Sequence, residues 1–175
     1  MADLTEQQMK ERDIDWFCLI NGRPSHMASM GGVLPGKFRN REVLRRQQDL
    51  VAQIQPFVDV QLNLNNIQTQ LKEGYEYLRD QTINSAIVEA NKDNPGFLYL
   101  KDYDLPMRLF ASTFVEMARR GFWSYVRRDD VAGNEYLLIA EPVGPIGYEW
   151  KPLKLMELEY KQGVVGNSII IRNSI

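Results

Sequence analysis

Residues Gly31 to Lys37 have the spacing G-x-x-x-x-G-K of a phosphate-binding loop. In such a loop, successive backbone N–H groups surround a phosphate, the lysine contacts it, and a following hydroxyl binds Mg²⁺. Here Phe38 stands where the serine or threonine belongs, and Pro35 lacks one of the N–H groups. These two departures disfavour a nucleoside triphosphate site, and the simpler interpretation is a glycine loop that leads into a helix.

This loop could still bind a simpler anion or a partner, because the N-terminus of a helix attracts negative charge. We therefore treat loop 31–37 as the first candidate for a binding surface. The candidate ligand-binding or anion-binding residues are Gly31, Gly32, Gly36, Lys37 and Arg39.

His26 is the single histidine of the chain, and its ordinary pKa lies nearest to neutrality among the side chains. Strand alternation puts Ser25 on the opposite face, so Ser25 is not a neighbouring nucleophile. Cys18, the single cysteine, could face His26 across a hairpin that turns at Asn21-Gly22, although its apolar neighbours would suppress the thiolate. His26 and Cys18 are therefore weak catalytic candidates, set against a structural or surface histidine and a buried thiol.

Metal binding is poorly supported by the residue types present. One histidine and one cysteine cannot complete a Cys/His zinc site. Asp102 and Asp104 could hold a hard cation, but Asp104 precedes Leu105-Pro106 and an amphipathic segment, which favours a helix N-cap. We predict neither a metal nor another cofactor.

Basic residues concentrate in two clusters that could form a nucleic-acid interface if they merged into one stripe. The whole chain has 21 basic and 23 acidic residues and a net charge of −2 at pH 7, which disfavours nucleic acid as the main partner. The clusters are Lys37, Arg39, Arg41, Arg45 and Arg46, and then Arg119, Arg120, Arg127 and Arg128.

Two features late in the chain are candidates for a protein-partner surface. An isoleucine-rich strand over residues 164–172, if left unpaired, would invite self-association. The second feature is a group of aromatic residues, namely Trp123, Tyr125, Tyr148 and Trp150.

The hydrophobic pattern that must position these residues mixes hairpins with helices. Apolar positions repeat with helical spacing over residues 40–54, 65–78 and 104–120, and a short polar helix is expected over residues 4–12. Thr82 is a candidate N-cap for a second piece after 65–78, so this segment is either one long helix with a phase slip or two helices. Strands are predicted over 14–20 and 23–30 as one hairpin, 122–128 and 135–141 as another, and 57–64, 97–100 and 164–172, while 148–161 fits either a strand or a helix. The prediction is an α+β fold, with a mixed, largely antiparallel sheet packed by three to four helices.

The length and composition predict one domain. The chain has 175 residues, of which 44% are apolar and 25% charged, as in ordinary globular proteins. We expect a single globular domain over residues 1–175 with a short polar N-terminal segment, 1–13. No apolar run reaches the roughly 18 residues of a membrane span, and we expect a cytoplasmic protein without a membrane partner.

Three functions remain open from these residues. The first is a non-catalytic module that binds a protein or a ligand, including a second copy of this chain, because the residues of a catalytic site are nearly all missing. The second is a small-molecule enzyme with a site at His26 and loop 31–37. The third is a nucleic-acid-binding accessory protein that uses the two arginine clusters.

Overall fold

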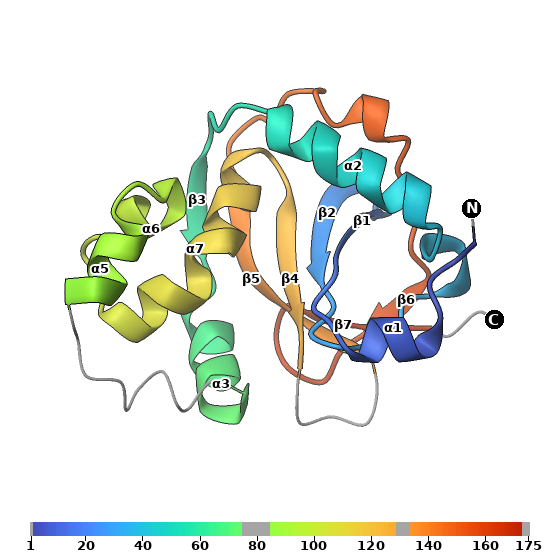
Figure 1. Ribbon diagram of the computed structural model, residues 1–175, viewed down its shortest axis with the longest axis horizontal. Helices are drawn as coiled ribbons and strands as arrows, with labels where there is room; N and C mark the ends of the chain where they lie inside the picture. The colour runs from blue at the N-terminus through green and yellow to red at the C-terminus, as the bar shows by residue number, and fades with distance from the viewer. Residues whose placement is uncertain (1, 75–84, 129–133, 173–175) are drawn as a thin grey trace.

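The fold is α+β, with one curled mixed sheet and helices on both sides (Figure 1). The computed structural model describes residues 2–74, 85–128 and 134–172. Within these ranges, no helix is long and apolar enough to cross a membrane.

The sheet has the strand order β1-β2-β4-β5-β7-β6, and β3 pairs with the far end of β5. Among the strands that the structure describes, all pairings are antiparallel except that of β2 with β4. This parallel pairing joins the first hairpin to the second half of the chain. The strands are β1 (Asp15–Ile20), β2 (Arg23–Ala28), β3 (Asp59–Leu62), β4 (Trp123–Arg127), β5 (Glu135–Val143), β6 (Tyr160–Gln162) and β7 (Ser168–Ile171).

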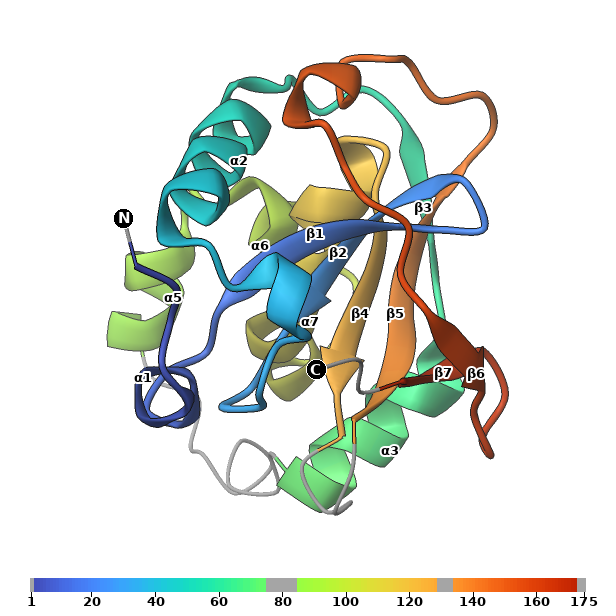
Figure 2. The same ribbon diagram turned by 90° about the vertical axis from the view of Figure 1, so that its right-hand side faces the viewer.

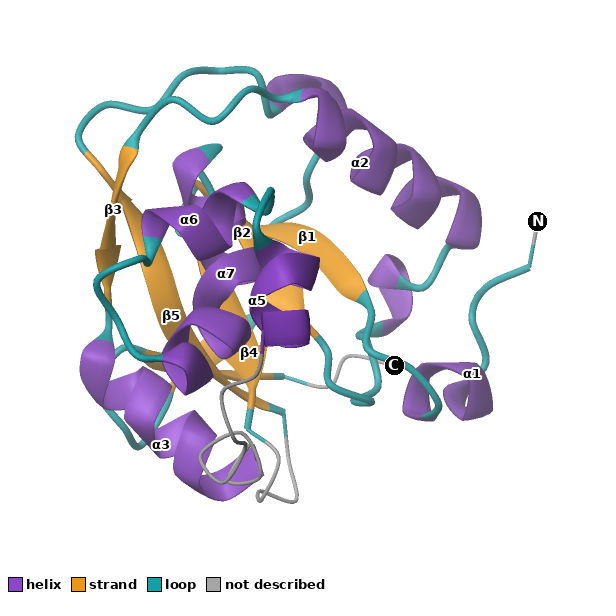
Figure 3. Ribbon diagram, turned by 60° about the vertical axis from the view of Figure 1, so that its left-hand side comes forward, coloured by secondary structure: helices purple, strands orange, loops and turns teal. Residues whose placement is uncertain are grey.

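Helices gather over one face of the sheet, where α7 lies against β4 and β5 with α3, α5 and α6 around it (Figure 3). Apolar side chains of α7 and α3 pack there on Val126, Leu137 and Ile139. Helix α2 runs beside β1 at the end of this layer. The helices are α1 (Glu6–Lys10), α2 (Arg41–Gln53), α3 (Leu64–Gly74), α5 (Ser85–Asn91), α6 (Pro95–Tyr99) and α7 (Leu105–Arg119).

The opposite face is covered by irregular chain rather than by long helices. There, α1, the short 3-10 helix η1 (Gly36–Phe38) and the C-terminal segment lie over the sheet (Figure 2). Trp16, Tyr136 and Leu34 are buried beneath them. The segment after the 3-10 helix η2 (Lys151–Leu153) also covers the outer edge of β1, through two backbone hydrogen bonds of 2.8 Å to Leu19.

Local sequence signals explain several elements. Asn21 and Gly22 have φ values of 54° and 72°, as a tight turn between antiparallel strands requires, and they join β1 to β2. Asp104 accepts a hydrogen bond from the Met107 N–H at 3.1 Å, and Pro106 lies in the first turn of α7. The predicted N-cap role of Asp104 is confirmed.

The strand predicted over residues 97–100 is wrong, because this segment belongs to α6. The Asn94 side chain accepts hydrogen bonds from the N–H groups of Gly96 and Phe97, and Pro95 begins the helix. Gly96 then lies against α7, since a Cβ atom there would be 2.1 Å from the Ser112 carbonyl oxygen. The capping asparagine therefore determines this segment more than its apolar run does.

Other predicted elements are present but shorter. The strand expected over 57–64 covers Asp59–Leu62, and the one expected over 164–172 covers Ser168–Ile171. The undecided stretch 148–161 contains η2 and the start of β6. The predicted N-cap at Thr82 and the end of the helix expected over 65–78 lie outside the described residues.

Candidate functional site

Three polar side chains lie in a row across adjacent strands, on the face of the sheet that the helices cover. Asp15 and Phe17 alternate onto this face of β1, His26 pairs with Phe17 on β2, and Ser124 pairs with His26 on β4. The parallel β2–β4 pairing thus brings together residues 98 positions apart in the sequence.

His26 hydrogen-bonds both neighbours in this row. Its Nε2 lies 2.7 Å from Oδ1 of Asp15, and its Nδ1 lies 2.7 Å from Oγ of Ser124. An ionised carboxylate can only accept, so Nε2 carries the hydrogen, and in the neutral ring Nδ1 accepts from the Ser124 hydroxyl. The ring also contacts Phe17 and Phe114, at 5.6 and 5.9 Å between ring centres. Two hydrogen bonds and two ring contacts therefore fix the orientation of the His26 ring.

Burial differs sharply along the row. The side chain of His26 and the whole of Ser124 are fully buried, whereas the Asp15 side chain is 43% exposed. Burial alone would raise the pKa of Asp15, but the hydrogen bond and charge of His26 outweigh it and hold the pKa below its ordinary value of 3.8. Asp15 is therefore the accessible end of the row, and it is ionised at neutral pH.

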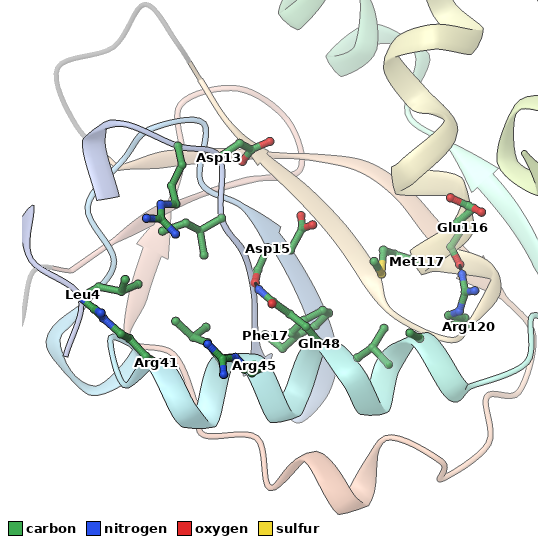
Figure 4. Close-up of a pocket in the computed structure, with 15 residues that line it drawn as sticks. Leu4, Asp13, Asp15, Phe17, Arg41, Arg45, Gln48, Glu116, Met117 and Arg120 are labelled. Atoms are coloured by element: carbon green, nitrogen blue, oxygen red, sulfur yellow. Dashed lines mark hydrogen bonds between the residues drawn. The ribbon is translucent and has the colours of Figure 1, made fainter. Parts of the chain in front are cut away.

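Asp15 opens into a groove of about 680 Å³ between α2, the start of β1 and the end of α7 (Figure 4). Arg41, Arg45 and Gln48 come from α2, and the Gln48 side chain donates to the Asp15 carbonyl oxygen at 2.8 Å. Apolar side chains form much of the remaining wall. They are Leu4, Ile14, Phe17, Leu44, Val51, Ala52 and Met117.

The four arginines of the groove differ in how many of their donors form hydrogen bonds with the protein. Arg120 donates to the carbonyl oxygens of Ile54 and Glu116, at 2.9 and 3.0 Å, so it serves the fold. Arg41 donates to the Gln8 side chain, and its buried Nε has no hydrogen-bond partner. The side chains of Arg12 and Arg45 make no hydrogen bond or ion pair with any residue in the described ranges. Three cations therefore retain free donors in one groove.

Two further carboxylates line the groove. Burial raises the pKa of Asp13, the negative charge of Asp15 raises it further, and the N–H of Met30, 2.9 Å from Oδ1 of Asp13, opposes this shift. Burial also raises the pKa of Glu116, although the charge of Arg120 opposes it. The groove thus has both signs of charge, and Asp15 is the carboxylate whose ionised form the protein stabilises.

The row contains the residue types of a serine, histidine and aspartate triad in a different arrangement. In such a triad the serine faces the substrate and the carboxylate is buried behind the histidine. Here Ser124 is buried and does not line the groove, and the carboxylate is exposed. The Asp15 carboxylate is thus held in the groove, and the Ser124 hydroxyl has no access to a substrate.

The expected approach of Cys18 to His26 does not occur. Cys18 pairs with Ser25, so alternation turns its side chain to the other face of the sheet. There it is completely buried, and burial raises the pKa of its thiol. The hairpin register, one residue away from the one that we assumed, separates the two candidates.

Loop 31–37 lies apart from the groove and lines none of its walls. Lys37 donates to the Glu157 carbonyl oxygen at 2.6 Å, and Arg39 donates to that of Leu34 at 2.7 Å. Gly31 has a φ of 77°, and Gly32 faces the Arg127 side chain so closely that a Cβ atom would be 2.3 Å from its Cδ. Both basic side chains and Gly32 therefore have structural contacts, as does Gly36 at the start of η1.

The residues of the two arginine clusters are distributed over several places in the structure. Arg41 and Arg45 line the groove with Arg120, whereas the Arg119 guanidinium lies 5.1 Å from the ring of Tyr99 and Arg128 pairs with Glu135 at 2.6 Å. Within the described part of the chain, no three His, Cys, Asp or Glu side chains gather as metal ligands.

The four aromatic candidates for a partner surface also separate. Tyr125 is buried, and burial raises its pKa to about 12. Trp123 packs against the same apolar cluster as Tyr125. It lies under Arg23, with 5.0 Å between the guanidinium carbon and the ring centre. Trp150 packs against a different part of the core, while Tyr148 is 72% exposed.

Sequence reasoning selected His26 but missed Asp15 and Ser124. An available signal was the alternation that places Asp15, a charged residue in an apolar strand, on the same face as Phe17. The position of Ser124 depends on the parallel pairing of β2 with β4, which short-range patterns do not show. No protein-family model, curated protein or solved structure matches the chain, so the function of the groove has to be inferred from its own residues.

Proposed function

We propose that the protein is a ligand-binding module, and that its groove binds a small molecule through a cationic or hydrogen-bond-donating group on Asp15. The observation that carries this proposal is the position of the Asp15 carboxylate. It is 43% exposed in the groove, and a fully buried histidine holds it from behind. A carboxylate fixed in this way is ready to accept hydrogen bonds without losing side-chain freedom on binding.

Binding is favoured over catalysis by the acid–base properties of the row. A general base works best with a pKa near the operating pH, whereas His26 holds the pKa of Asp15 below 3.8. His26 itself is fully buried and both of its ring nitrogens are hydrogen-bonded, so it has no free nitrogen for a ligand. The Asp15 carboxylate is therefore suited to staying ionised rather than to taking up a proton at neutral pH.

The test is a pair of titrations followed by amide chemical-shift changes in NMR spectra, with ethanolamine and agmatine as probes. We expect both amines to shift the amides of residues 13–17 and of Gln48, since these surround the Asp15 carboxylate. The Asp15→Asn variant is expected to lose at least about tenfold in affinity, because a charge-assisted hydrogen bond becomes a neutral one.

The matched control is Asp49→Asn, which removes an exposed carboxylate from α2 that does not line the groove. It is expected to bind both amines as the unmodified protein does. Equal affinities of the Asp15→Asn variant and the unmodified protein would contradict the proposal, as would shifts that avoid residues 13–17 altogether.

An enzyme is the second candidate, and the short hydrogen bonds of the Asp15–His26–Ser124 row support it. Such an enzyme would need Ser124 to become accessible. A fluorophosphonate, which labels activated serines, distinguishes the two proposals. We expect no labelling of Ser124 in the folded protein, whereas stoichiometric labelling that His26→Ala abolishes would favour the enzyme.

A further inference from the structure

We infer that one end of the groove is a phosphomonoester site, so that the ligand of the groove carries a phosphate in addition to the donor group that binds Asp15. This inference rests on the proposed function and names the class of its ligand. The residues that would bind the phosphate are Arg12, Arg41 and Arg45, which we call the arginine end.

Within the described residues, the three arginines of this end have no acidic partner. Asp13 and Asp15 nevertheless line the same groove. Asp13 instead accepts a backbone hydrogen bond from Met30, and Asp15 accepts from His26. The acidic side chains are thus satisfied by the protein, while the guanidinium groups keep donors for a ligand.

The three arginines line the same groove from two segments of the chain. Arg41 and Arg45 are one helical turn apart, and both lie at the start of α2 along the groove (Figure 4). The N-terminal segment, from which Arg12 comes, is tied to this place by a bridge between Asp3 and Asn40 and by a 2.9 Å hydrogen bond from the Leu4 N–H to the Arg39 carbonyl oxygen. Two segments of the chain therefore meet at the arginine end.

Arg41 has a buried donor without a partner among the described residues. Nε of Arg41 is inaccessible to solvent and has no acceptor among the described residues, which is costly unless a ligand supplies one. An oxyanion at this end would accept from it once the Arg41 guanidinium turns toward the groove on binding, and the positive N-terminal end of the 13-residue helix α2 adds to the attraction.

The charge of the site favours phosphate over carboxylate. Three arginines exceed what one carboxylate needs, whereas a phosphomonoester has a charge near −2 at neutral pH and three strong acceptor oxygens. Arginine also suits phosphate because its planar guanidinium can donate two parallel hydrogen bonds. A ligand with an amine and a phosphate would then match the carboxylate of Asp15 and the arginine end together.

The experiment uses the full chain and four probes, namely inorganic phosphate, ethanolamine, O-phosphoethanolamine and its longer homologue aminohexyl phosphate. Affinities are measured by NMR titration for the unmodified protein and for Arg45→Gln, with Arg46→Gln as the control. Arg46 is the adjacent residue on α2, is exposed and does not line the groove. Because Arg45 makes no contact of its own with charged residues, its replacement should leave the fold unchanged, which thermal unfolding verifies.

We expect inorganic phosphate to shift the amides around Arg12, Arg41 and Arg45, and at least one aminoalkyl phosphate to bind more tightly than phosphate or ethanolamine alone. Arg45→Gln should weaken phosphate and the aminoalkyl phosphates about tenfold, while Arg46→Gln should change them by less than about twofold. Neither variant should alter the binding of ethanolamine.

The outcomes of this experiment distinguish a failure of the phosphate site from a failure of the proposed function. If ethanolamine binds at Asp15 but phosphate leaves the arginine end unshifted, the phosphate site is wrong and the proposed function is retained. If phosphate binds through Arg45 but no amine responds to Asp15→Asn, the phosphate site is supported and the role of Asp15 is wrong. Tighter, Arg45-dependent binding of a single-stranded DNA oligonucleotide, which has only phosphodiesters, would overturn the assignment to a small phosphomonoester.

Discussion

Nε2 of His26 lies 2.7 Å from Oδ1 of Asp15, so a completely buried ring holds a carboxylate that is 43% exposed in the groove. Ser124 holds the other ring nitrogen at the same distance from the neighbouring strand. The sheet thus orients an anion toward the solvent by means of two residues that solvent does not reach. This arrangement explains why the accessible group of the row is the aspartate.

Replacing His26 by phenylalanine is expected to lower the free energy of unfolding by about 1–3 kcal/mol, because the buried Ser124 hydroxyl loses its partner. Urea unfolding of the single variants and of the double variant His26→Phe, Ser124→Ala measures this. In the His26→Phe variant, the further change Ser124→Ala should lower the free energy of unfolding by less than it does in the unmodified protein, because the hydroxyl then has no hydrogen bond to His26 to lose. Additive effects of the two changes would contradict the hydrogen bond between them.

The pH dependence of the free energy of unfolding should also report the hydrogen bond between His26 and Asp15. Since its pKa in the folded protein lies below the ordinary 3.8, ionised Asp15 stabilises the fold above pH 3.8, and this contribution is lost as the pH falls through the lower folded value. Asp13 and Glu116 have raised pKa values and act in the opposite direction. We therefore expect the stability difference between the unmodified protein and Asp15→Asn to shrink on acidification below pH 3.8.

That difference is measured by urea unfolding at a series of pH values. The contribution of Glu116 is common to both proteins and cancels. Asp15 raises the pKa of Asp13, so the contribution of Asp13 differs between the two proteins above pH 3.8, and the comparison is therefore made below that value. A stability difference that grows as the pH is lowered would show that the pKa of Asp15 is raised rather than lowered.

The thiol of Cys18 should be unreactive toward alkylating reagents in the folded protein. Its thiol is fully buried and burial raises its pKa, so little thiolate forms and no reagent reaches it. Iodoacetamide followed by mass spectrometry should label Cys18 only after denaturation. Rapid alkylation of the native protein at mildly alkaline pH would mean that this hairpin opens or that Cys18 has another environment.

Asp104→Ala should lower the free energy of unfolding by about 1 kcal/mol, because the N–H of Met107 at the start of α7 loses its acceptor. Asp102→Ala is the matched control, since Asp102 is exposed and caps no helix within the described residues. Equal effects of the two substitutions would indicate a general charge effect in place of capping.

The elements that the sequence predicted well are those with strong local signals. Asn21-Gly22 indicated the first hairpin, and Asp104 with Pro106 indicated the start of α7. The segment at Phe97 failed because its four apolar residues fit a strand or a helix, and the Asn94 cap decides between them. Local patterns therefore sufficed wherever a cap or a turn residue was given its proper weight.

The candidate site was harder to predict because it depends on long-range pairing. His26 was found for being the single histidine, but its partner Ser124 lies 98 residues away, and Asp15 read as an ordinary strand residue. The basic cluster was also identified without its division of roles. Lys37 and Arg39 bind carbonyl oxygens of the protein, whereas Arg41 and Arg45 line the groove. Only the packing of α2 beside β1 makes this distinction.

The most direct test of the account is the titration of the Asp15 carboxyl carbon by ¹³C NMR, alone and with saturating O-phosphoethanolamine. We expect a midpoint below 3.8 in the free protein and a still lower one with the probe, because an amine bound to the carboxylate favours its ionised form. A midpoint at or above 3.8 that the probe leaves unchanged would contradict both the hold of His26 on Asp15 and the role of Asp15 in binding.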